Sequence, residues 1–376
     1  MFRTIIMLCG FIIVALLLLF IAPAGTYAVP PAITADAVVL MDAVTGQVFY
    51  AKNSYKQCPP ASLTKIMTAI IALENGKPDD VATVSRKAAS ISDGSIIDLH
   101  PGEKITLHNL LKAALISSAN DSTVVIAEHV GGSESRFIEM MNTKAILLGA
   151  LNTRYANTNG YTHPNHYSTA YDLALIARYA LKNPQFAQYV RRREAVVEWY
   201  DRSRKEAIHN TNRLLFGGYP EINGVKTGST SIAGSCLIAS AGKDGRHLIT
   251  VVLHSGDRYR DAIRLLGYGF SQVESVDLCK AKEPVGCLAV GGGIYLAVTV
   301  VAEREVNADL LRSDLPELRR EINLNSFVEA PVRAGQKLGE AVFYLRGQEL
   351  ARVSLVAAEA VPRKGWVVHM REKVFG

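Results

Sequence analysis

The sequence predicts an α/β (α+β) fold, in which an antiparallel sheet packs against a cluster of helices, followed by a small all-β domain. Strand patterns lie both before and after a long block of helical periodicity, so we expect the first and last strands to meet in one sheet. Beyond about residue 273 the pattern changes to short alternating stretches, which are typical of an all-β domain. A chain of 376 residues is long enough for two such units.

The first predicted elements are a hairpin and a helix. Apolar stretches within residues 37–52 flank a turn at 42–46, which predicts a β-hairpin. From Ala61 onward apolar residues recur at helical spacing, with Pro60 before the first turn and Gly76 after the last. We therefore expect the chain to enter a buried helix at Ala61.

Helices dominate the middle of the chain. A helical pattern that follows Thr106 stops near Ser117 and resumes as far as Gly131. Residues 157–168 are rich in Asn, Gly, Pro and Thr and are expected to be irregular, whereas residues 170–181 are predicted to be helical. The break near Ser117 is informative, because such a break projects side chains into a cleft.

Strands return after Asn223-Gly224. We expect adjacent strands at 225–230, 235–241 and 247–254, and a helix at 257–267 that closes the first unit. In the second unit we expect strands at 295–302 and 321–330 and a hairpin over 341–356 around Gly347.

Composition and charge limit the classes of protein to which this chain can belong. The chain is 49% hydrophobic and 20% charged, which is a globular composition. It has 41 basic and 35 acidic residues, and its formal charge of +6 is spread without long runs, so nucleic-acid binding is not expected.

Residues 1–28 are predicted to be an export signal peptide. An apolar run from Ile5 to Ile21 follows a basic residue and leads to small residues that end at Ala28. The alternative is an uncleaved membrane anchor, because the run is near the length that spans a bilayer. Four cysteines remain after the signal, of which Cys279 and Cys287 either form a local bridge or stay free thiols.

Ser62 and Lys65 open the buried helix and form the first candidate catalytic pair. They are three residues apart and share a helix face, which brings the amine near the hydroxyl. A serine is a weak nucleophile until a base takes its proton, and a lysine is such a base only if burial or a neighbouring cation lowers its pKa. Alone, a Ser-x-x-Lys sequence is usually a solvated pair on a helix surface.

Two further triplets carry candidate functional groups. Ser118-Ala119-Asn120 lies at the predicted helix break, where Ser118 is placed to relay protons and Asn120 to hold a substrate amide. Lys226-Thr227-Gly228 lies on a predicted strand, where alternation sends Lys226 and Gly228 to one face and Thr227 to the other. Glycine allows close approach of a ligand, and the lysine and threonine suit a carboxylate. Each triplet alone is an ordinary cap, turn or strand sequence.

Together and in this order, the three triplets resemble the motif set of the low-molecular-mass penicillin-binding proteins, specifically the serine-type D-alanyl-D-alanine carboxypeptidases, a set shared with serine β-lactamases. Residues 60–69, 120–121, 167–172 and 224–228 are similar to that family, and the resemblance covers nearly the whole chain. It implies a penicillin-binding/β-lactamase-like transpeptidase fold. We expect a D,D-peptidase domain at 30–272 and a β-rich domain at 286–360.

The resemblance also implies roles for the candidate residues. Ser62 attacks the penultimate D-Ala carbonyl, Lys65 is the general base, and Ser118 passes a proton to the departing D-Ala. Lys226 and Thr227 hold the terminal carboxylate, and the backbone amides of Ser62 and Ser229 form the oxyanion hole. Asn120 and Gly228 complete the predicted substrate-binding set.

The expected partners are peptidoglycan stem peptides, with β-lactam antibiotics as covalent inhibitors, and the expected location is outside the cytoplasm, at the cell wall or the outer face of the membrane. No metal or organic cofactor is implied.

Residues 361–376 are predicted to be a short amphipathic tail that associates peripherally with the membrane, because apolar residues from Trp366 onward share one helical face beside basic ones. The alternative is a frayed basic tail.

Four rival functions use parts of the same pattern. A class A β-lactamase needs a carboxylate after the Ser-x-Asn triplet, and the sequence has no Asp or Glu between Met140 and Tyr171, so we expect penicillin to acylate Ser62 and leave slowly. An endopeptidase that cuts peptidoglycan crosslinks would use the same chemistry. A metal-dependent carboxypeptidase would need clustered ligands, and the only close histidine pair, His163 and His166, is predicted to be a surface turn. A catalytically idle wall-binding protein is the alternative from another class.

Overall fold

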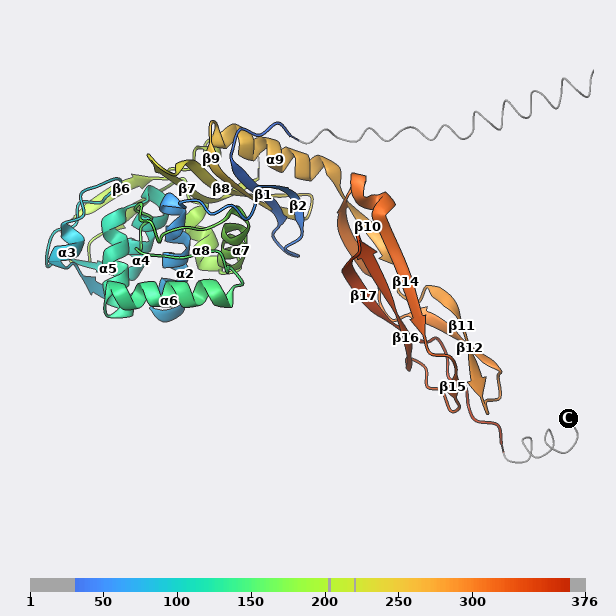
Figure 1. Cartoon of the computed structure of the whole chain (residues 1–376). Coiled ribbons are helices and arrows are strands. Elements are labelled where there is room, and N and C mark those ends of the chain that lie inside the picture. Colours follow the sequence, from blue (N-terminus) through green and yellow to red (C-terminus); the bar gives the residue numbers. More distant parts are fainter. Residues whose placement is uncertain (1–30, 202–203, 220, 366–376) are drawn as a thin grey trace, which may run out of the picture. The chain divides into compact units, whose positions relative to one another are not determined.

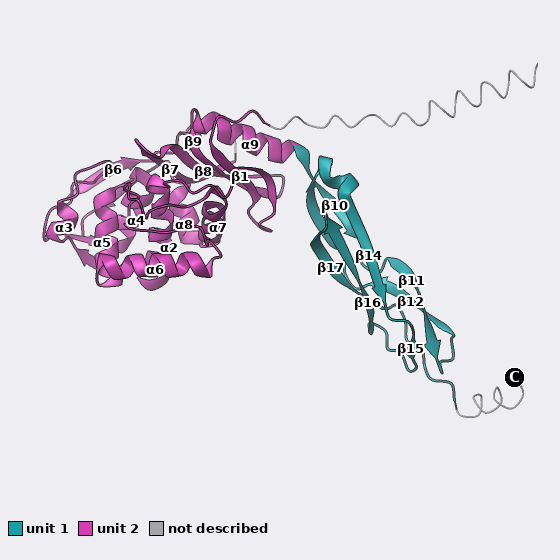
Figure 2. Ribbon diagram, viewed as in Figure 1, with its two compact units in different colours: residues 1–30, 272–376 teal, residues 31–271 magenta. Residues whose placement is uncertain are grey.

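The computed structural model describes residues 31–365 apart from 202, 203 and 220 (Figure 1). The predicted export signal and the tail from residue 366 therefore lie outside the described residues. The chain divides into two compact units, one of residues 31–271 and one that includes residues from 272 onward, and Figure 2 colours them separately.

The first unit is built on an antiparallel sheet with helices on both faces. Among the described residues this sheet has five strands in the order β2-β1-β9-β8-β7. The strands are β1 (Ala37–Asp42), β2 (Val48–Lys52), β7 (Ile222–Thr230), β8 (Gly234–Lys243) and β9 (Arg246–Ser255). Val39 of β1 pairs with Val251 of β9, so the first and last strands meet as predicted.

The helices of the first unit form a cluster on one face of this sheet, and the last one packs on the other face (Figure 1). The cluster comprises α2 (Lys65–Asn75), α3 (Arg86–Ala89), α4 (Leu107–Lys112), α5 (Asn120–Gly131), α6 (Glu134–Leu147), α7 (Ala170–Leu181) and α8 (Pro184–Val190). Helix α9 (Arg258–Gln272) crosses the opposite face, where Gly269 lies against Leu40 and Leu248. Two short antiparallel pairs, β3 (Val81–Thr83) with β4 (Lys104–Thr106) and β5 (Glu194–Glu198) with β6 (Lys205–His209), also belong to this unit.

Side-chain caps explain why several helices begin where they do. Thr106 accepts a hydrogen bond from the Asn109 amide at the start of α4, and Thr169 accepts one from the Asp172 amide at the start of α7. Each cap satisfies a backbone donor that has no partner within its helix. The predicted helix at 170–181 is confirmed with the same bounds.

Two predicted helices differ from the expectation in a way that shapes the site. Residues Ala61–Thr64 form a 3-10 turn, η1, and the α-helix begins only at Lys65. The break near Ser117 is confirmed as a π-helical turn, η2 (Ala113–Ser117), which ends at Ser118 in a left-handed conformation with φ +68°. Extra backbone in a π turn is common at functional sites, because it redirects the residues that follow.

The second unit is all-β, as predicted. Within its described residues, a six-stranded sheet has the order β14-β16-β17-β12-β11-β15, and β10 pairs with β13. The bounds are β10 (Val273–Cys279), β11 (Pro284–Gly291), β12 (Ala297–Ala302), β13 (Val306–Leu311), β14 (Leu318–Leu324), β15 (Val328–Glu329), β16 (Lys337–Leu345) and β17 (Gln348–Ala357). Its core includes Val300, Leu338 and Phe343, which are all buried.

The predicted fold class is confirmed, and several element assignments are corrected. The single strand expected at 321–330 is wrong, because β14 ends at Leu324 and β15 pairs separately, and in parallel, with β11. Helices α6 and α8 and the β5–β6 hairpin were not predicted. Cys58, Cys236, Cys279 and Cys287 are all free, so the bridge considered for the last two is not formed.

Candidate active site

A cleft of about 410 Å³ in the first unit collects most of the predicted site residues. Its lining comes from the η1 turn, the 93–99 segment, the η2–α5 junction, the 159–161 loop, strand β7, and single residues at 211 and 258. The lining residues include Ser62, Ser118, Asn120, Asn159, Gly160, Tyr161, Thr211, Thr227, Gly228, Ser229 and Arg258. Lys65 and Lys226 lie behind this lining and are almost completely buried.

Lys65 is hydrogen-bonded to the hydroxyl of Ser62. Its Nζ lies 2.8 Å from Ser62 Oγ, 2.7 Å from Asn120 Oδ1 and 2.9 Å from the carbonyl oxygen of Asn159. The side chain is 0% exposed and all three partners are uncharged. Burial, and then the charge of Lys226, hold the pKa of Lys65 well below its ordinary value, although Asp121 opposes the shift. The site therefore favours a neutral amine next to the serine.

Ser118 and Asn120 are brought to the cleft by the break between η2 and α5. Ser118 is buried and its left-handed backbone reverses the chain direction at this point. Asn120 is held on both sides of its amide group, because Oδ1 accepts from Lys65 and Nδ2 donates to the Asp93 carbonyl at 2.8 Å. The break in helical periodicity was the sequence signal for this arrangement.

Strand β7 forms the opposite wall, and consecutive residues near its end contribute to the lining. Thr227, Gly228 and Ser229 all line the cleft, whereas Lys226 is buried behind it and donates to the Thr227 carbonyl at 3.1 Å. Burial, and then the charge of Arg258, lower the pKa of Lys226 to about 7. Gly228 contributes only backbone atoms to the lining, so the alternation expected for Lys226, Thr227 and Gly228 stays a prediction.

Arg258, at the start of α9, is a cleft residue that sequence reasoning missed. Its Nη1 donates to the Gly228 carbonyl at 2.9 Å, to Ser229 Oγ at 2.8 Å and to the Cys236 carbonyl at 3.2 Å. It therefore places a second cation beside the end of β7. No motif marks it among the basic residues of the chain, and only the fold brings it there.

Asp121 is a buried carboxylate next to Asn120 that organises the cleft from behind. It accepts hydrogen bonds from the backbone amides of Ile97 at 3.1 Å, Leu99 at 3.2 Å and Ser122 at 2.8 Å. Burial raises its pKa, and these backbone donors oppose that rise. The carboxylate thus fixes the 93–99 segment, whose Gly94 and Ser95 also line the cleft.

Tyr161 and Thr211 complete the cleft and were also not predicted. The Tyr161 hydroxyl donates to the Asp93 carbonyl at 2.7 Å. The Thr211 and Thr227 hydroxyl oxygens lie 2.6 Å apart. Neither residue belongs to a triplet, and each reaches the cleft through a loop.

The histidine pair does not form a metal site. His163 is exposed, as expected for a surface turn, but His166 is 2% exposed and lies 2.8 Å from Thr64 Oγ1, so the surface assignment is wrong for His166. Among the residues that the structure describes, no group of three or more His, Cys, Asp or Glu side chains is placed to hold a metal ion.

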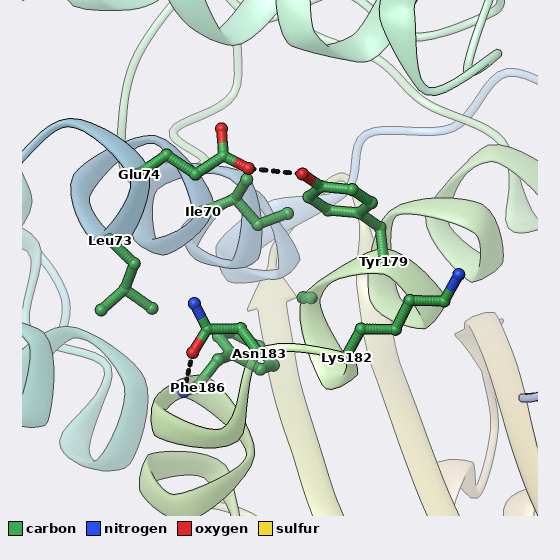
Figure 3. A pocket seen from close by; sticks show the side chains of 8 residues that line it. Ile70, Leu73, Glu74, Tyr179, Lys182, Asn183 and Phe186 are labelled. Carbon is green, nitrogen blue, oxygen red and sulfur yellow. Dashed lines mark hydrogen bonds between the residues drawn. The ribbon is translucent and has the colours of Figure 1, made fainter.

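A second pocket lies at the opposite end of α2 from Lys65 (Figure 3). It is lined by apolar side chains that include Ile70, Leu73 and Phe186, and its volume is about 290 Å³. At its edge the Tyr179 hydroxyl donates to Glu74 at 2.6 Å. None of the predicted site residues lines it, so the chemistry is concentrated in the cleft at Ser62.

Comparisons with known proteins identify the family that both units of the chain match. A family model described as D-alanyl-D-alanine carboxypeptidase matches residues 24–256, and one described as penicillin-binding protein 5, C-terminal domain, matches residues 274–363. The chain is 35% identical over 346 residues to D-alanyl-D-alanine carboxypeptidase DacF of Bacillus subtilis, which covers 90% of this chain and 88% of the relative.

Solved structures show the same fold. Penicillin-binding protein 5 from Haemophilus influenzae is 28% identical and covers 89% of this chain and all of its own, with a TM-score of 0.71. Penicillin-binding protein 6B from Escherichia coli is 29% identical, with a TM-score of 0.70, and covers 89% of this chain and 98% of its own. The likeness extends through both units.

Proposed function

The chain belongs to the D-alanyl-D-alanine carboxypeptidase family, and on that premise we propose that Ser62 is the nucleophile with which this serine peptidase removes the terminal D-Ala from peptidoglycan pentapeptide stems. The observation that carries the proposal is the 2.8 Å bond between Ser62 Oγ and the buried Nζ of Lys65. Crosslink cleavage by an endopeptidase and an idle wall-binding protein are not favoured, because the matching family is one of carboxypeptidases.

Lys65 acts as the general base. A neutral amine has two protons and one lone pair, and two of its three partners, Asn120 Oδ1 and the Asn159 carbonyl, are oxygens that can only accept. They take the two protons, so the lone pair faces Ser62 Oγ, the one partner with a proton to give. As Ser62 Oγ bonds to the penultimate D-Ala carbonyl carbon, its proton passes to Lys65 Nζ.

The remaining groups stabilise and resolve the intermediate. The backbone N–H groups of Ser62 and Ser229 bind the oxyanion, a term that usually contributes several kcal/mol to catalysis. As the amide bond breaks, Ser118 passes a proton to the nitrogen of D-Ala and takes up the proton held by Lys65, which leaves a neutral Lys65 and an ester on Ser62. Water then hydrolyses that ester and releases the shortened stem. β-Lactams acylate Ser62 by the same attack and leave it slowly.

The carboxylate of the terminal D-Ala is recognised at the end of β7. Thr227 offers a hydroxyl at the cleft surface, and Lys226 supplies positive charge from behind it. Asn120 and Gly228 bound the space for the peptide, and Gly228 leaves room because it has no side chain. The charge of Arg258 reinforces the positive potential, since its hydrogen bonds to Gly228 and Ser229 hold the guanidinium beside the end of β7.

We further propose that the protein works outside the cytoplasm and contacts the membrane peripherally. The predicted signal at residues 1–28 supports export, residues 30–272 form the peptidase domain and residues 286–360 form a β-rich domain. No helix among the described residues is long and apolar enough to cross a membrane. We propose that the contact is made by the chain that follows Val361 and by the surface beside it.

The surface beside the start of the tail is apolar and basic. The turn between β11 and β12 exposes Ile294, Tyr295 and Leu296 at 48%, 58% and 78%. This turn is bonded to the departing chain, because the Ile294 amide donates to the Pro362 carbonyl and the Lys364 amide donates to the Gly292 carbonyl. Exposed Tyr and Leu beside Arg363 and Lys364 suit the interface of an anionic bilayer.

Ser62→Ala should abolish both D-Ala release and covalent labelling by fluorescent penicillin, because the proposed mechanism has no other nucleophile. Lys65→Ala should slow acylation by about 10² to 10⁴-fold, the usual contribution of a general base. The exposed Lys77→Ala is the matched control and should acylate normally. Label on the Ser62→Ala protein would refute the mechanism.

Lys226→Ala should lower kcat/KM for peptides that end in a free carboxylate by roughly 10 to 150-fold more than for the matching C-terminal amides, as expected for a charge-assisted hydrogen bond of about 1.5 to 3 kcal/mol. The pKa of Lys226 is lowered to about 7, and lysine is charged below its pKa. The preference for the carboxylate should therefore weaken from pH 6 to pH 8 in the unaltered protein and not in the variant. Lys243→Ala, on the exposed end of β8, is the control. Equal losses on both substrate types would exclude carboxylate recognition by Lys226.

The Tyr295→Ser/Leu296→Ser variant should bind anionic vesicles of phosphatidylglycerol and phosphatidylcholine more weakly than the unaltered protein. Truncation after Pro362 should weaken this binding further. The two changes remove apolar area and charge from one surface. Leu151→Ser, which changes an exposed leucine in the other unit, is the control. If the truncated and full-length mature proteins also partition identically in fractionated cells, the tail is no anchor.

A further inference from the structure

The residue before the nucleophile has an unusual backbone conformation. Ala61 has φ +48°, a left-handed value that residues other than glycine rarely adopt, and it is fully buried. Such a conformation persists only where the surroundings hold it. Two glycines show how tightly the surroundings close: a methyl group added at Gly160 would lie 1.9 Å from the Ala61 carbonyl oxygen, and one at Gly228 would lie 3.0 Å from the Ser62 nitrogen.

The peptide between Ala61 and Ser62 links this conformation to the chemistry. A peptide group is planar and trans, so its carbonyl oxygen and its N–H point in opposite directions. Whatever fixes the Ala61 oxygen therefore fixes the direction of the Ser62 N–H. Under the proposed function, on which this inference rests, that N–H is one of the two donors to the oxyanion.

A relay of two side chains holds the Ala61 oxygen. Thr64 Oγ1 donates to it at 2.9 Å, which uses the only hydroxyl proton. Thr64 must therefore accept from His166 Nε2, 2.8 Å away. His166 Nδ1 accepts from the Ala156 amide at 3.1 Å, which places the proton of the neutral ring on Nε2. A single tautomer satisfies all three bonds.

The surroundings of His166 keep that tautomer. The ring is 2% exposed and packs edge-on against Tyr155, with ring centroids 5.6 Å apart. Burial, and then the charge of His163, lower its pKa to about 4, so the ring is neutral at neutral pH. Thr64 is 0% exposed, so water does not compete for either bond.

We infer that His166 is a positioning residue of the oxyanion hole. Through Thr64 it holds the Ala61 carbonyl and so aims the Ser62 N–H at the oxyanion. It touches neither the substrate nor the reacting atoms. Its effect should appear in the turnover of bound substrate and not in substrate binding.

The test compares two pairs of variants of the full-length mature protein. Thr64→Val keeps the shape of the side chain but has no hydroxyl, and Thr64→Ser keeps the hydroxyl. His166→Leu removes the donor, and His166→Gln keeps an N–H at similar reach. Each variant is assayed with an ester substrate and with its thionoester analogue, whose sulfur is a poor hydrogen-bond acceptor and so gains little from the oxyanion hole.

The Val and Leu variants should lose at least about 10-fold in kcat on the ester with little change in KM, since an oxyanion donor usually contributes 10² to 10³-fold. Their preference for ester over thionoester should fall by a similar factor. The Thr64→Ser and His166→Gln variants should keep most of the kcat on the ester and most of the preference for ester over thionoester. The double variant Thr64→Val/His166→Leu should lose no more than the worse single variant, because both act through one peptide.

Three results would overturn the inference: an unchanged ester-to-thionoester preference in Thr64→Val, equal damage in Thr64→Ser and Thr64→Val, or additive losses in the double variant. If the substituted proteins fail to fold, the unaltered protein still decides, because nitrogen NMR must find the His166 proton on Nε2, and a proton on Nδ1 excludes the relay. Penicillin labelling separates this inference from the proposed function. Absence of label at Ser62 in the unaltered protein refutes both, whereas normal label with an unchanged preference in the variants refutes only the role of His166.

Discussion

The active centre depends on the burial of Lys65 without a hydrogen-bonded carboxylate partner. Its three bonds go to Ser62, Asn120 and the Asn159 carbonyl, which are all uncharged. A buried ammonium without a direct counter-ion is expensive, so the protein stabilises the amine instead. This burial lowers the pKa of Lys65, and that lowered pKa is what the proposed role of Lys65 as a base requires.

Three segments that are distant in the sequence lie around the groups near Lys65: two approach the η1 turn, and the third lies against Asn120. The 93–99 segment is fixed by Asp121, the 157–161 loop brings Gly160 against Ala61, and strand β7 brings Gly228 against Ser62. A methyl group added at Gly160 would lie 1.9 Å from the Ala61 carbonyl oxygen, and one added at Gly228 would lie 3.0 Å from the Ser62 nitrogen. The resulting cleft is therefore a consequence of backbone packing as much as of the catalytic side chains, and a small error in any segment would reach the serine.

Sequence spacing predicted the parts of the site that are local and missed those that come from tertiary packing. Ser62 and Lys65 could be placed together because three residues span one turn, although that turn is 3-10 and not α-helical. Ser118 was found because a π turn interrupts helical periodicity. Arg258 and His166 reach the site through long-range contacts, so no periodicity marks them. The fold class was predictable because strands flank a helical block, whereas α6, with few buried positions, gave too weak a pattern.

The protonation state of Lys65 in the free protein is the most direct test of this account. Selective labelling of lysine Nζ and Cε allows each amine to be titrated by NMR, and the Lys65 signal is identified by its absence in Lys65→Arg. The Lys65 amine should lose its proton at a pH well below 10.5, the ordinary pKa of lysine, because burial lowers its pKa. A Lys65 that stays charged until about pH 10 would contradict it, because the serine would then have no base at neutral pH.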